Sequence, residues 1–278
     1  MQDDAKRTFA VAGTLCLVCS VLVSTAAVVL RPAQQENQRL DVQKNILEVA
    51  GIYDETKPIG AQYDDGWKKL VVLGHMPGSK PGELGKPNGE QLSKEDAADV
   101  GIDFATFDSR KAIKNEKLSK EIDDGALPQI ARRSHYMFVY EIRGDSKDAP
   151  LEKIILPIYG KGLWSTLYGF ISLEPDCETI AGITFYDHGE TPGLGGEVDN
   201  ADWKASWQGK KAFNNGDFTK PTISVVKGKG TGHSQIDGLS GATITSKGVN
   251  DLVKYWLGPD AFGPYLDRVR SEQNPKAE

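Results

Sequence analysis

The chain has 278 residues, of which 39% are hydrophobic and 26% are charged, and its formal net charge at pH 7 is −6. This length and composition predict a mostly soluble protein of one or two domains with a substantial core. The acidic balance argues against a nucleic-acid partner, because binding to a phosphate backbone needs clustered Lys and Arg side chains.

An uncharged apolar run extends from Phe9 to Leu30, after Lys6-Arg7 and before Arg31-Pro32. At about 1.5 Å per residue, a helix of this length crosses a hydrocarbon core of roughly 30 Å. The alternative is a cleaved signal peptide, because Ser24-Thr25-Ala26 is a candidate cleavage site. The run is longer than the ~7–15 apolar residues usual in signal peptides. We therefore expect residues 9–30 to form an uncleaved transmembrane helix.

The charges beside this run predict its orientation. Two basic residues, Lys6 and Arg7, precede it, and Arg31 directly follows it. The excess before the run predicts that residues 1–8 are a cytoplasmic tail and that the rest of the chain lies outside the inner membrane. Cys16 and Cys19 lie within the run, where such a pair is more often a packing feature than a metal site, unless a partner protein adds ligands. We predict no metal site and no catalytic residue in this chain.

Residues 31–133 are predicted to form a stalk helix and an irregular α/β region. The helix covers residues 34–50 and ends at Gly51, a typical C-cap residue. Residues 53–99 are rich in Gly, Pro, Lys and Asp, with one apolar run at 70–74. The charged segment 111–124 is expected to be a solvated helix or loop without a site.

A β-rich domain is predicted at residues 134–270, followed by a polar tail at 271–278. Turn signals separate five apolar segments, at residues 134–142, 153–158, 167–173, 180–186 and 222–226. Because no helical pattern lies between the middle segments, we predict a mainly antiparallel sheet with flanking helices, an α+β fold. The glycine-rich residues 228–232 lack the spacing of a phosphate-binding loop and are expected to form a turn.

Residues 237–243 read Asp-Gly-Leu-Ser-Gly-Ala-Thr and precede an amphipathic helical pattern that ends at Gly258. We expect the helix to begin near Thr245 or Ser246, where its free N–H groups and its dipole would stabilise a phosphate. Thr243 would supply a hydroxyl to carry such a group. On local physics alone, a hydroxyl-rich cap without a ligand is the more common meaning of this stretch.

Residues 188–196 read His-Gly-Glu-Thr-Pro-Gly-Leu-Gly-Gly and follow the segment at 180–186. The glycines indicate a loop whose backbone can approach a flat ligand closely. Taken alone, the loop is a tight turn in which Glu190 caps backbone groups. His188 has no second His or Cys at ligand spacing, and we expect it to face solvent. Upstream, Trp164 lies in a third glycine-containing stretch, residues 160–170, as either a ring-packing or a core residue.

The three stretches carry a family resemblance. Residues 237–243 resemble the D-G-x-S/T-G-A-T motif at which a flavin transferase esterifies FMN, through its phosphate, to the last threonine. Residues 188–195 resemble the loop that lines the flavin in FMN-binding domains of membrane redox complexes, and residues 160–170 resemble a stretch of the same family. With one N-terminal anchor and residues 45–51, the chain is similar to the NqrC family, which belongs to the sodium-translocating NADH:quinone oxidoreductases. The related RnfG family is the close alternative.

The resemblance implies covalent FMN on Thr243 in an extracytoplasmic domain that relays single electrons within a complex of several proteins in the bacterial inner membrane. Its partners would be the other subunits and, during maturation, a flavin transferase that recognises Asp237 and Gly238. The implied further contacts to FMN come from all three stretches and are Ser240, Gly241, Ala242, Glu190, Thr191, Gly193, Leu194, Gly195, Trp164 and Ser165. We expect the loop at 190–195 to hold the isoalloxazine ring. A membrane-anchored binding or assembly module without redox activity is the alternative from another class.

Overall fold

The structure, a computed structural model, describes residues 2–73, 89–122, 125–144 and 149–273. The chain divides into two units, Met1–Lys44 and Asn45–Glu278, which are described separately. Most of the predicted polar tail at 271–278 lies outside the described residues.

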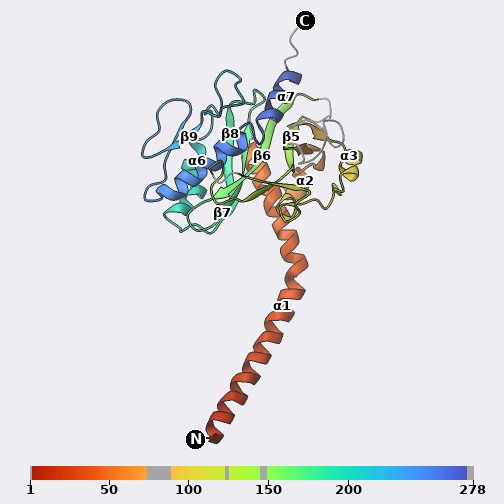
Figure 1. Cartoon of the computed structure of the whole chain (residues 1–278), viewed down its shortest axis with the longest axis vertical. Coiled ribbons are helices and arrows are strands. Elements are labelled where there is room, and N and C mark those ends of the chain that lie inside the picture. The colour runs from red at the N-terminus through yellow and green to blue at the C-terminus, as the bar shows by residue number, and fades with distance from the viewer. Residues whose placement is uncertain (1, 74–88, 123–124, 145–148, 274–278) are drawn as a thin grey trace. The chain divides into compact units, whose positions relative to one another are not determined.

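Helix α1 runs from Gln2 to Ala50 (Figure 1); its residues up to Lys44 belong to the first unit, and its last six residues belong to the second. The predicted span and stalk helix are one continuous helix, with Pro32 inside it. The part of α1 that begins at Ala5 is long and apolar enough to cross a membrane. Gly51 ends the helix with a φ of 75°, the left-handed C-cap that the sequence predicts.

The second unit is built on a six-stranded sheet in the order β2-β1-β5-β6-β7-β8, in which all neighbouring strands are antiparallel. The strands are β1 (Lys68–Val72), β2 (Gln91–Leu92), β5 (Tyr136–Arg143), β6 (Leu151–Lys161), β7 (Thr166–Leu173) and β8 (Ile180–Asp187). The predicted antiparallel sheet is confirmed, and four of the five predicted segments form β5 to β8.

Strands β1 and β2 come from the region predicted to be irregular. Leu70 of β1 pairs with Phe138 of β5 on one side and with Leu92 of β2 on the other. The sheet therefore includes residues upstream of the boundary that the sequence predicts at residue 134. Other short elements of this region are α2 (Ile59–Gln62), η1 (Asp65–Trp67), α3 (Lys94–Asp99), α4 (Ser109–Ala112), β3 (Ser119–Glu121) and β4 (Arg132–Ser134). The charged segment at 111–124 thus contains a strand, β3, paired antiparallel with β4.

The fifth predicted strand is not part of the large sheet. Strand β9 (Ser224–Val226) pairs in parallel with β10 (Gln235–Asp237), and Val225 lies opposite Ile236. The turn predicted between them is confirmed, since Gly228 and Gly232 have φ values of 79° and 78°. This pair of strands lies beside helix α6, whose Asn250 side chain accepts the N–H of Val225 at 3.2 Å.

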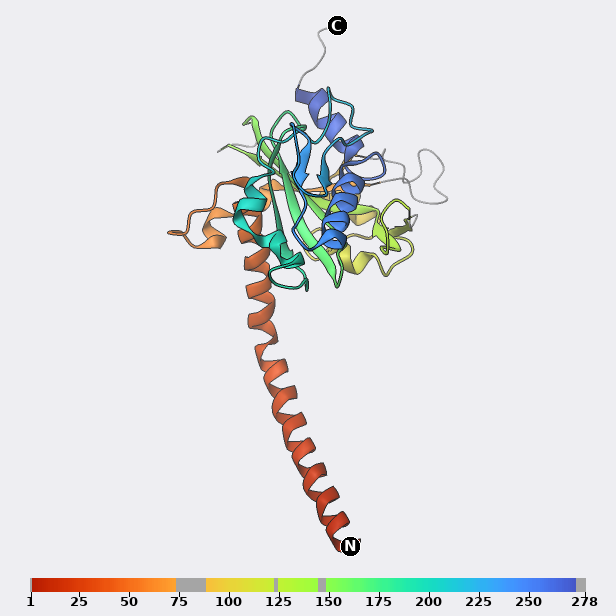
Figure 2. The same ribbon diagram turned by 90° about the vertical axis from the view of Figure 1, so that its left-hand side faces the viewer.

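Helix α6 (Thr243–Leu257) packs on β6 of the sheet, as Figures 1 and 2 show in blue and green. Its apolar side is buried, and the Trp256 indole N–H donates to the Tyr159 carbonyl at 2.6 Å. Gly160 of β6 lets the Leu252 side chain of α6 pack closely on the strand, because a Cβ on Gly160 would lie 2.5 Å from the Leu252 Cβ. The remaining helices are η2 (Gly195–Asp199), α5 (Ala201–Ala205) and α7 (Gly263–Gln273).

The two faces of β8 contact different elements, because alternate residues of a strand point to opposite faces. Ile183 and Phe185 belong to the core cluster that also contains the buried residues of α6. On the other face, the Thr184 hydroxyl donates to the Asn45 side chain at 3.1 Å, and Gly182 lies against the Val49 backbone. The end of α1 and helix α6 therefore cover opposite faces of the sheet.

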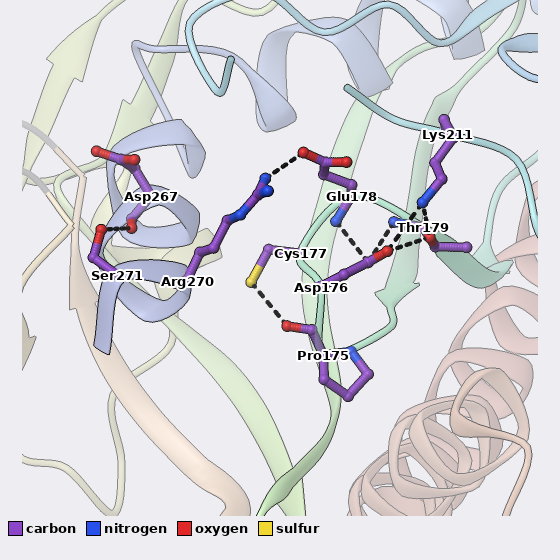
Figure 3. A network of polar contacts seen from close by, with 9 residues as sticks. All are labelled: Pro175, Asp176, Cys177, Glu178, Thr179, Lys211, Asp267, Arg270 and Ser271. Atoms are coloured by element: carbon purple, nitrogen blue, oxygen red, sulfur yellow. Dashed lines mark hydrogen bonds and ion pairs between the residues drawn. The ribbon is translucent and has the colours of Figure 1, made fainter. Parts of the chain in front are cut away.

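The β7–β8 turn is a polar network that ties the sheet to α7 (Figure 3). The Asp176 carboxylate accepts the N–H groups of Glu178 and Thr179 at 2.9 and 2.7 Å, and Glu178 pairs with Arg270 of α7. Asp176 is exposed, and although partial desolvation raises its pKa, the Thr179 hydroxyl and these N–H groups lower it to about 2. Cys177 lies buried in the turn with a φ of 60°, and burial raises the pKa of its thiol to about 12.

Candidate functional site

Thr243 is the first residue of α6 and is exposed to solvent. The spacing of the apolar residues predicts a helix start two or three residues later, at Thr245 or Ser246, and the β-branched run Thr243-Ile244-Thr245 has only modest helix propensity. Tertiary contacts stabilise the first turn instead. The Leu239 N–H donates to the Ser246 hydroxyl at 2.9 Å, which fastens the preceding loop to the helix. The Thr243 hydroxyl therefore lies at a helix N-terminus, where an anionic group is favoured.

The loop before α6 turns sharply at Gly241, which has a φ of 71°. Ala242 follows as the N-cap residue and makes no side-chain capping bond. Ser240 and Gly241 are exposed, whereas Ala242 is buried. The hydroxyl-rich stretch is therefore not a simple helix cap, since Ala242 occupies the N-cap position and the hydroxyls of Ser240 and Thr243 do not.

A hollow of about 270 Å³ lies next to Thr243, between α6 and the β9–β10 pair. Its lining residues come from both sides and are Val225, Val226, Lys227, Gly228, Gly238, Leu239, Thr243, Ser246, Lys247 and Asn250. Two of them, Lys227 and Lys247, are cationic. Lys247 is ion-paired with Asp251, so Lys227 and the helix N-terminus supply the positive character that suits a phosphate on this side of Thr243.

Asp237 and Gly238 shape the turn that leads to this motif. The Asp237 carboxylate accepts the Gly230 N–H at 2.7 Å, and its carbonyl accepts the Trp203 indole N–H at 2.9 Å. A Cβ on Gly238 would lie 2.5 Å from the Val226 carbonyl oxygen. Both residues thus have structural contacts, and the transferase recognition that the resemblance implies for them stays a prediction.

Glu190 caps backbone N–H groups, as the sequence predicts, but it does so from a buried position, because only 5% of it is exposed. Its Oε1 atom accepts the N–H groups of Trp164 and Ser165 at 2.9 and 3.1 Å. Its Oε2 atom accepts the Leu163 N–H at 3.2 Å and the Thr245 hydroxyl at 2.7 Å. Burial raises the pKa of this carboxyl, but the donated hydrogen bonds outweigh it and lower the pKa below its ordinary value.

Thr245 is the residue that sequence reasoning missed. Only 1% of it is exposed, so it is a buried partner of Glu190 and not a cap at the start of α6. Gly162 was also missed, although its place in the glycine-containing stretch at 160–170 was a signal. A Cβ on Gly162 would lie 2.6 Å from Glu190 Oε1.

His188 does not face solvent as expected, since only 12% of its side chain is exposed. Its Nε2 atom lies 2.8 Å from Asp199 Oδ2, and its Nδ1 atom accepts the Glu190 N–H at 3.2 Å. His188 therefore orders the loop that follows β8. Across the described ranges, no cluster of three His, Cys, Asp or Glu side chains is arranged to hold a metal ion.

The rest of the loop folds around Thr191, whose carbonyl accepts the N–H groups of Leu194 and Gly196 at 3.1 and 2.9 Å. Gly193 has a φ of 74° and open space beside it, whereas Gly195 is buried. A Cβ on Gly195 would lie 2.6 Å from both Glu190 Oε2 and Thr245 Oγ1. The two glycines therefore serve different purposes, a left-handed turn and a close approach.

Four apolar side chains are exposed in the segments around Thr243. The large hydrophobic residues that are exposed in the described part of the chain after residue 50 are Ile52, Leu163, Trp164, Leu194 and Ile244. All but Ile52 belong to the three segments at 160–170, 188–196 and 237–245. Trp164, which is 68% exposed, is thus not a core residue. Leu194 reaches the Thr243 motif, since its Cδ2 atom would lie 3.0 Å from a Cβ on Gly241.

The geometry thus brings together every predicted site segment. The Glu190 carboxylate joins the turn at 162–165 to α6, and Leu194 joins the loop at 188–196 to Gly241. The site combines a hydroxyl at a helix start, a positive hollow on one side and exposed apolar side chains. It offers positions for a phosphate and for a flat apolar group, which is what FMN requires.

Comparisons with known proteins agree with this geometry. The family of FMN-binding domains matches residues 162–258, a range that contains the segments at 188–196 and 237–245 and all but the first two residues of the segment at 160–170. The NqrC subunit of the Na(+)-translocating NADH-quinone reductase of Yersinia pestis is 40% identical over 271 residues, covering 96% of this chain and 94% of that protein. The corresponding protein from Vibrio vulnificus is 43% identical over 276 residues and covers 96% of each chain.

Two solved structures have the same fold. The NqrC protein of Shewanella oneidensis superposes with a TM-score of 0.70 at 27% identity, covering 85% of this chain and 99% of that one. The corresponding protein of the Na(+)-translocating NADH-quinone reductase from Parabacteroides distasonis superposes with a TM-score of 0.57 at 28% identity, covering 86% and 96%. With the identity that extends along nearly its whole length, this chain belongs to the NqrC family of the Na(+)-translocating NADH-quinone reductases.

Proposed function

We propose that Thr243 carries FMN through a phosphoester bond and that the chain relays single electrons within a Na(+)-translocating NADH-quinone reductase. Membership of the NqrC family supports the place of the chain in that complex, and the match at 162–258 supports FMN as its cofactor. Identity to NqrC proteins over 96% of the chain favours this family over RnfG.

The observation that carries the proposal is the position of the Thr243 hydroxyl. It is exposed on the first residue of α6, beside the hollow that Lys227 and Lys247 line. A phosphate on this hydroxyl would meet N–H donors of the helix start and the positive charge of Lys227, since Lys247 is already ion-paired with Asp251. Thr245, in contrast, is buried against Glu190, and its hydroxyl is not available for modification.

The chain's own residues have the task of holding and placing the cofactor. The apolar side chains of Trp164, Leu194 and Ile244 would shield a flavin ring from water, since each is exposed near the attachment site. Flavin supplies the redox chemistry when it is bound, while the protein sets its position and electrostatic surroundings. A site of this kind needs no acid or base of the protein to transfer a proton to a substrate.

We further propose that α1 anchors the chain in the bacterial inner membrane, with residues 1–8 in the cytoplasm and the domain at 134–270 outside. The apolar part of α1 supports a span, and Lys6 and Arg7 support the orientation. The partners are then the other subunits of the complex and, before assembly, a flavin transferase. A reporter that is active only outside the inner membrane, fused after Glu278, should be active; an active cytoplasmic reporter would reverse this orientation.

Intact mass spectrometry of the full chain tests the cofactor. The chain produced together with a flavin transferase should gain the mass of one FMN less water, and the chain produced without the transferase should not. Thr243→Ala should abolish the gain. A chain that never gains flavin would favour the membrane-anchored binding or assembly module without redox activity.

A further inference from the structure

Glu190 presents an unusual arrangement for a loop residue. Its carboxylate is buried, and in the part of the chain that the structure describes no Lys or Arg side chain forms an ion pair with it. A buried charge is costly unless it is compensated by hydrogen bonds. Here the compensation comes from backbone N–H groups and from the Thr245 hydroxyl, so the surrounding chain is arranged around the carboxylate.

The donors come from two segments that are far apart in the sequence. Leu163, Trp164 and Ser165 form the turn between β6 and β7, and Thr245 lies in the first turn of α6. Glu190 itself belongs to a third segment, the loop after β8. One side chain therefore connects all three segments of the proposed flavin site.

Two glycines, Gly162 and Gly195, let the backbone approach the Glu190 carboxylate closely. A Cβ on Gly162 would lie 2.6 Å from Oε1, and a Cβ on Gly195 would lie 2.6 Å from Oε2. Larger residues at either position would displace the carboxylate from its donors. Glycine is thus needed at both positions to keep the three segments in contact.

We propose that Glu190 and Thr245 are positioning residues that hold the exposed Trp164 side chain in a fixed place relative to Thr243. This inference rests on the proposed function, because the position matters only if Thr243 carries the flavin. Thr245 lies two residues after Thr243 on α6, and the backbone N–H of Trp164 donates to the Glu190 carboxylate. The hydrogen bonds of Glu190 thus join the β6–β7 turn, which bears the exposed Trp164, to the start of α6, which bears the exposed Thr243.

The hydrogen bonds predict how each substitution acts. Thr245→Val preserves the shape of the side chain but removes the donor to Oε2. Glu190→Gln also preserves shape, but both carboxylate oxygens accept N–H groups, so the amide NH₂ would face a donor in either orientation. Thr245→Ser keeps the hydroxyl and should restore the contact. Thr222→Val is the matched control, because the Thr222 hydroxyl makes only long contacts, at 3.4 and 3.5 Å.

The first measurement is hydrogen exchange by mass spectrometry on the full chain in detergent, in a Thr243→Ala background that lacks flavin. Thr245→Val and Glu190→Gln should accelerate exchange in the peptide containing Leu163 to Ser165 by roughly tenfold or more, as loss of a hydrogen bond to a charged group predicts. In these two variants, exchange in β8 should not change. In the Thr222→Val control, exchange in the peptide containing Leu163 to Ser165 should not change either. Unchanged exchange at 163–165 in Thr245→Val would overturn the inference, and equal acceleration everywhere would overturn it too, by showing a general loss of stability instead.

The second measurement is the midpoint potential of the covalently bound flavin, made with protein that retains Thr243. Thr245→Val should keep the flavin mass but shift the potential and the visible circular dichroism of the flavin, and Thr245→Ser should return both to the original values. A potential unaffected by Thr245→Val would also refute a positioning role. If the unmodified protein gains no flavin at all, the proposed function fails, while the exchange experiment still decides whether Glu190 and Thr245 hold the turn.

Discussion

A Cβ on Gly248 in α6 would lie 2.1 Å from the carbonyl oxygen of Lys161 at the end of β6. The helix and the strand therefore approach one another more closely here than any side chain permits. This approach sets the distance between the start of α6, which bears Thr243, and the β6–β7 turn, which bears Trp164. The arrangement of the proposed flavin site depends on this glycine as much as on the residues that face the flavin.

Gly248→Ala should destabilise the protein, although Gly-to-Ala changes inside helices normally stabilise by about 1 kcal/mol. The methyl group would overlap the Lys161 carbonyl, and overpacking typically costs about 1–3 kcal/mol. Urea unfolding monitored by circular dichroism measures the change. Gly60→Ala in α2 is the control, because no atom lies within 4 Å of its added Cβ. A Gly248→Ala protein as stable as the original would show that the two elements can separate freely.

Gly195→Ala and Gly193→Ala should differ in their effects on the site. At Gly195 the added Cβ meets Glu190 and Thr245, so the flavin spectrum should change and thermal stability should fall. At Gly193 nothing is close, and only the left-handed backbone is strained, at a cost of about 1–3 kcal/mol. Absorbance spectra and thermal melts of the two variants check this. Equal flavin spectra in both would remove the Gly195 contact from the site.

The stability that Glu190 contributes should depend on pH. Its pKa in the folded chain is lower than the ordinary value of 4.5, so the contribution is complete above that value and is lost as the pH falls through the lower folded-state pKa. The difference in free energy of unfolding between the original protein and Glu190→Gln should therefore shrink on acidification below about pH 4.5. Comparing the two proteins cancels the titration of other acids, such as Asp176. A difference that grows on acidification would contradict the hydrogen bonds assigned to the carboxylate.

Cys177 should resist thiol reagents in the folded protein. Raising its pKa from 9.0 to about 12 lowers the thiolate fraction by about a thousandfold at neutral pH, and burial blocks access as well. Maleimide labelling followed by peptide mapping should modify Cys177 only after the domain is denatured. Rapid labelling at neutral pH without denaturant would show that the β7–β8 turn opens in the native state.

Much of the sheet could be predicted from the sequence, because β5 to β8 are continuous apolar runs between turn signals. Strand β1 was harder to recognise as part of it, since its five residues lie in a region of glycine, proline and charge and are paired only through distant β5 and the short β2. The parallel pairing of β9 with β10 depends on packing beside α6, which no local pattern reveals. Nor does a local pattern show that the helix begins at Thr243, where contacts made by Thr245 and Ser246 outweigh weak propensity.

The site segments were recognisable from their glycines and their family resemblance, but the tasks of individual residues were not. Glu190 has the pattern of a capping residue, and His188 that of a solvent-facing one. Each is covered because other segments fold over it, the β6–β7 turn over Glu190 and η2 with Asp199 over His188. Trp164 differs in the opposite direction, because it is an apolar residue that is exposed. Its turn is fixed by backbone N–H groups that donate to the buried Glu190 carboxylate, and the indole side chain remains in solvent.

The most direct test of the account is to locate the flavin on the chain by tandem mass spectrometry of the tryptic peptide spanning residues 230–247. This peptide carries several hydroxyl residues, among them Ser240, Thr243, Thr245 and Ser246. We predict that FMN, attached through its phosphate, is found on Thr243, the exposed hydroxyl at the start of α6. Flavin on Ser240 or on the buried Thr245, or a peptide without flavin from protein made with the transferase, would contradict it.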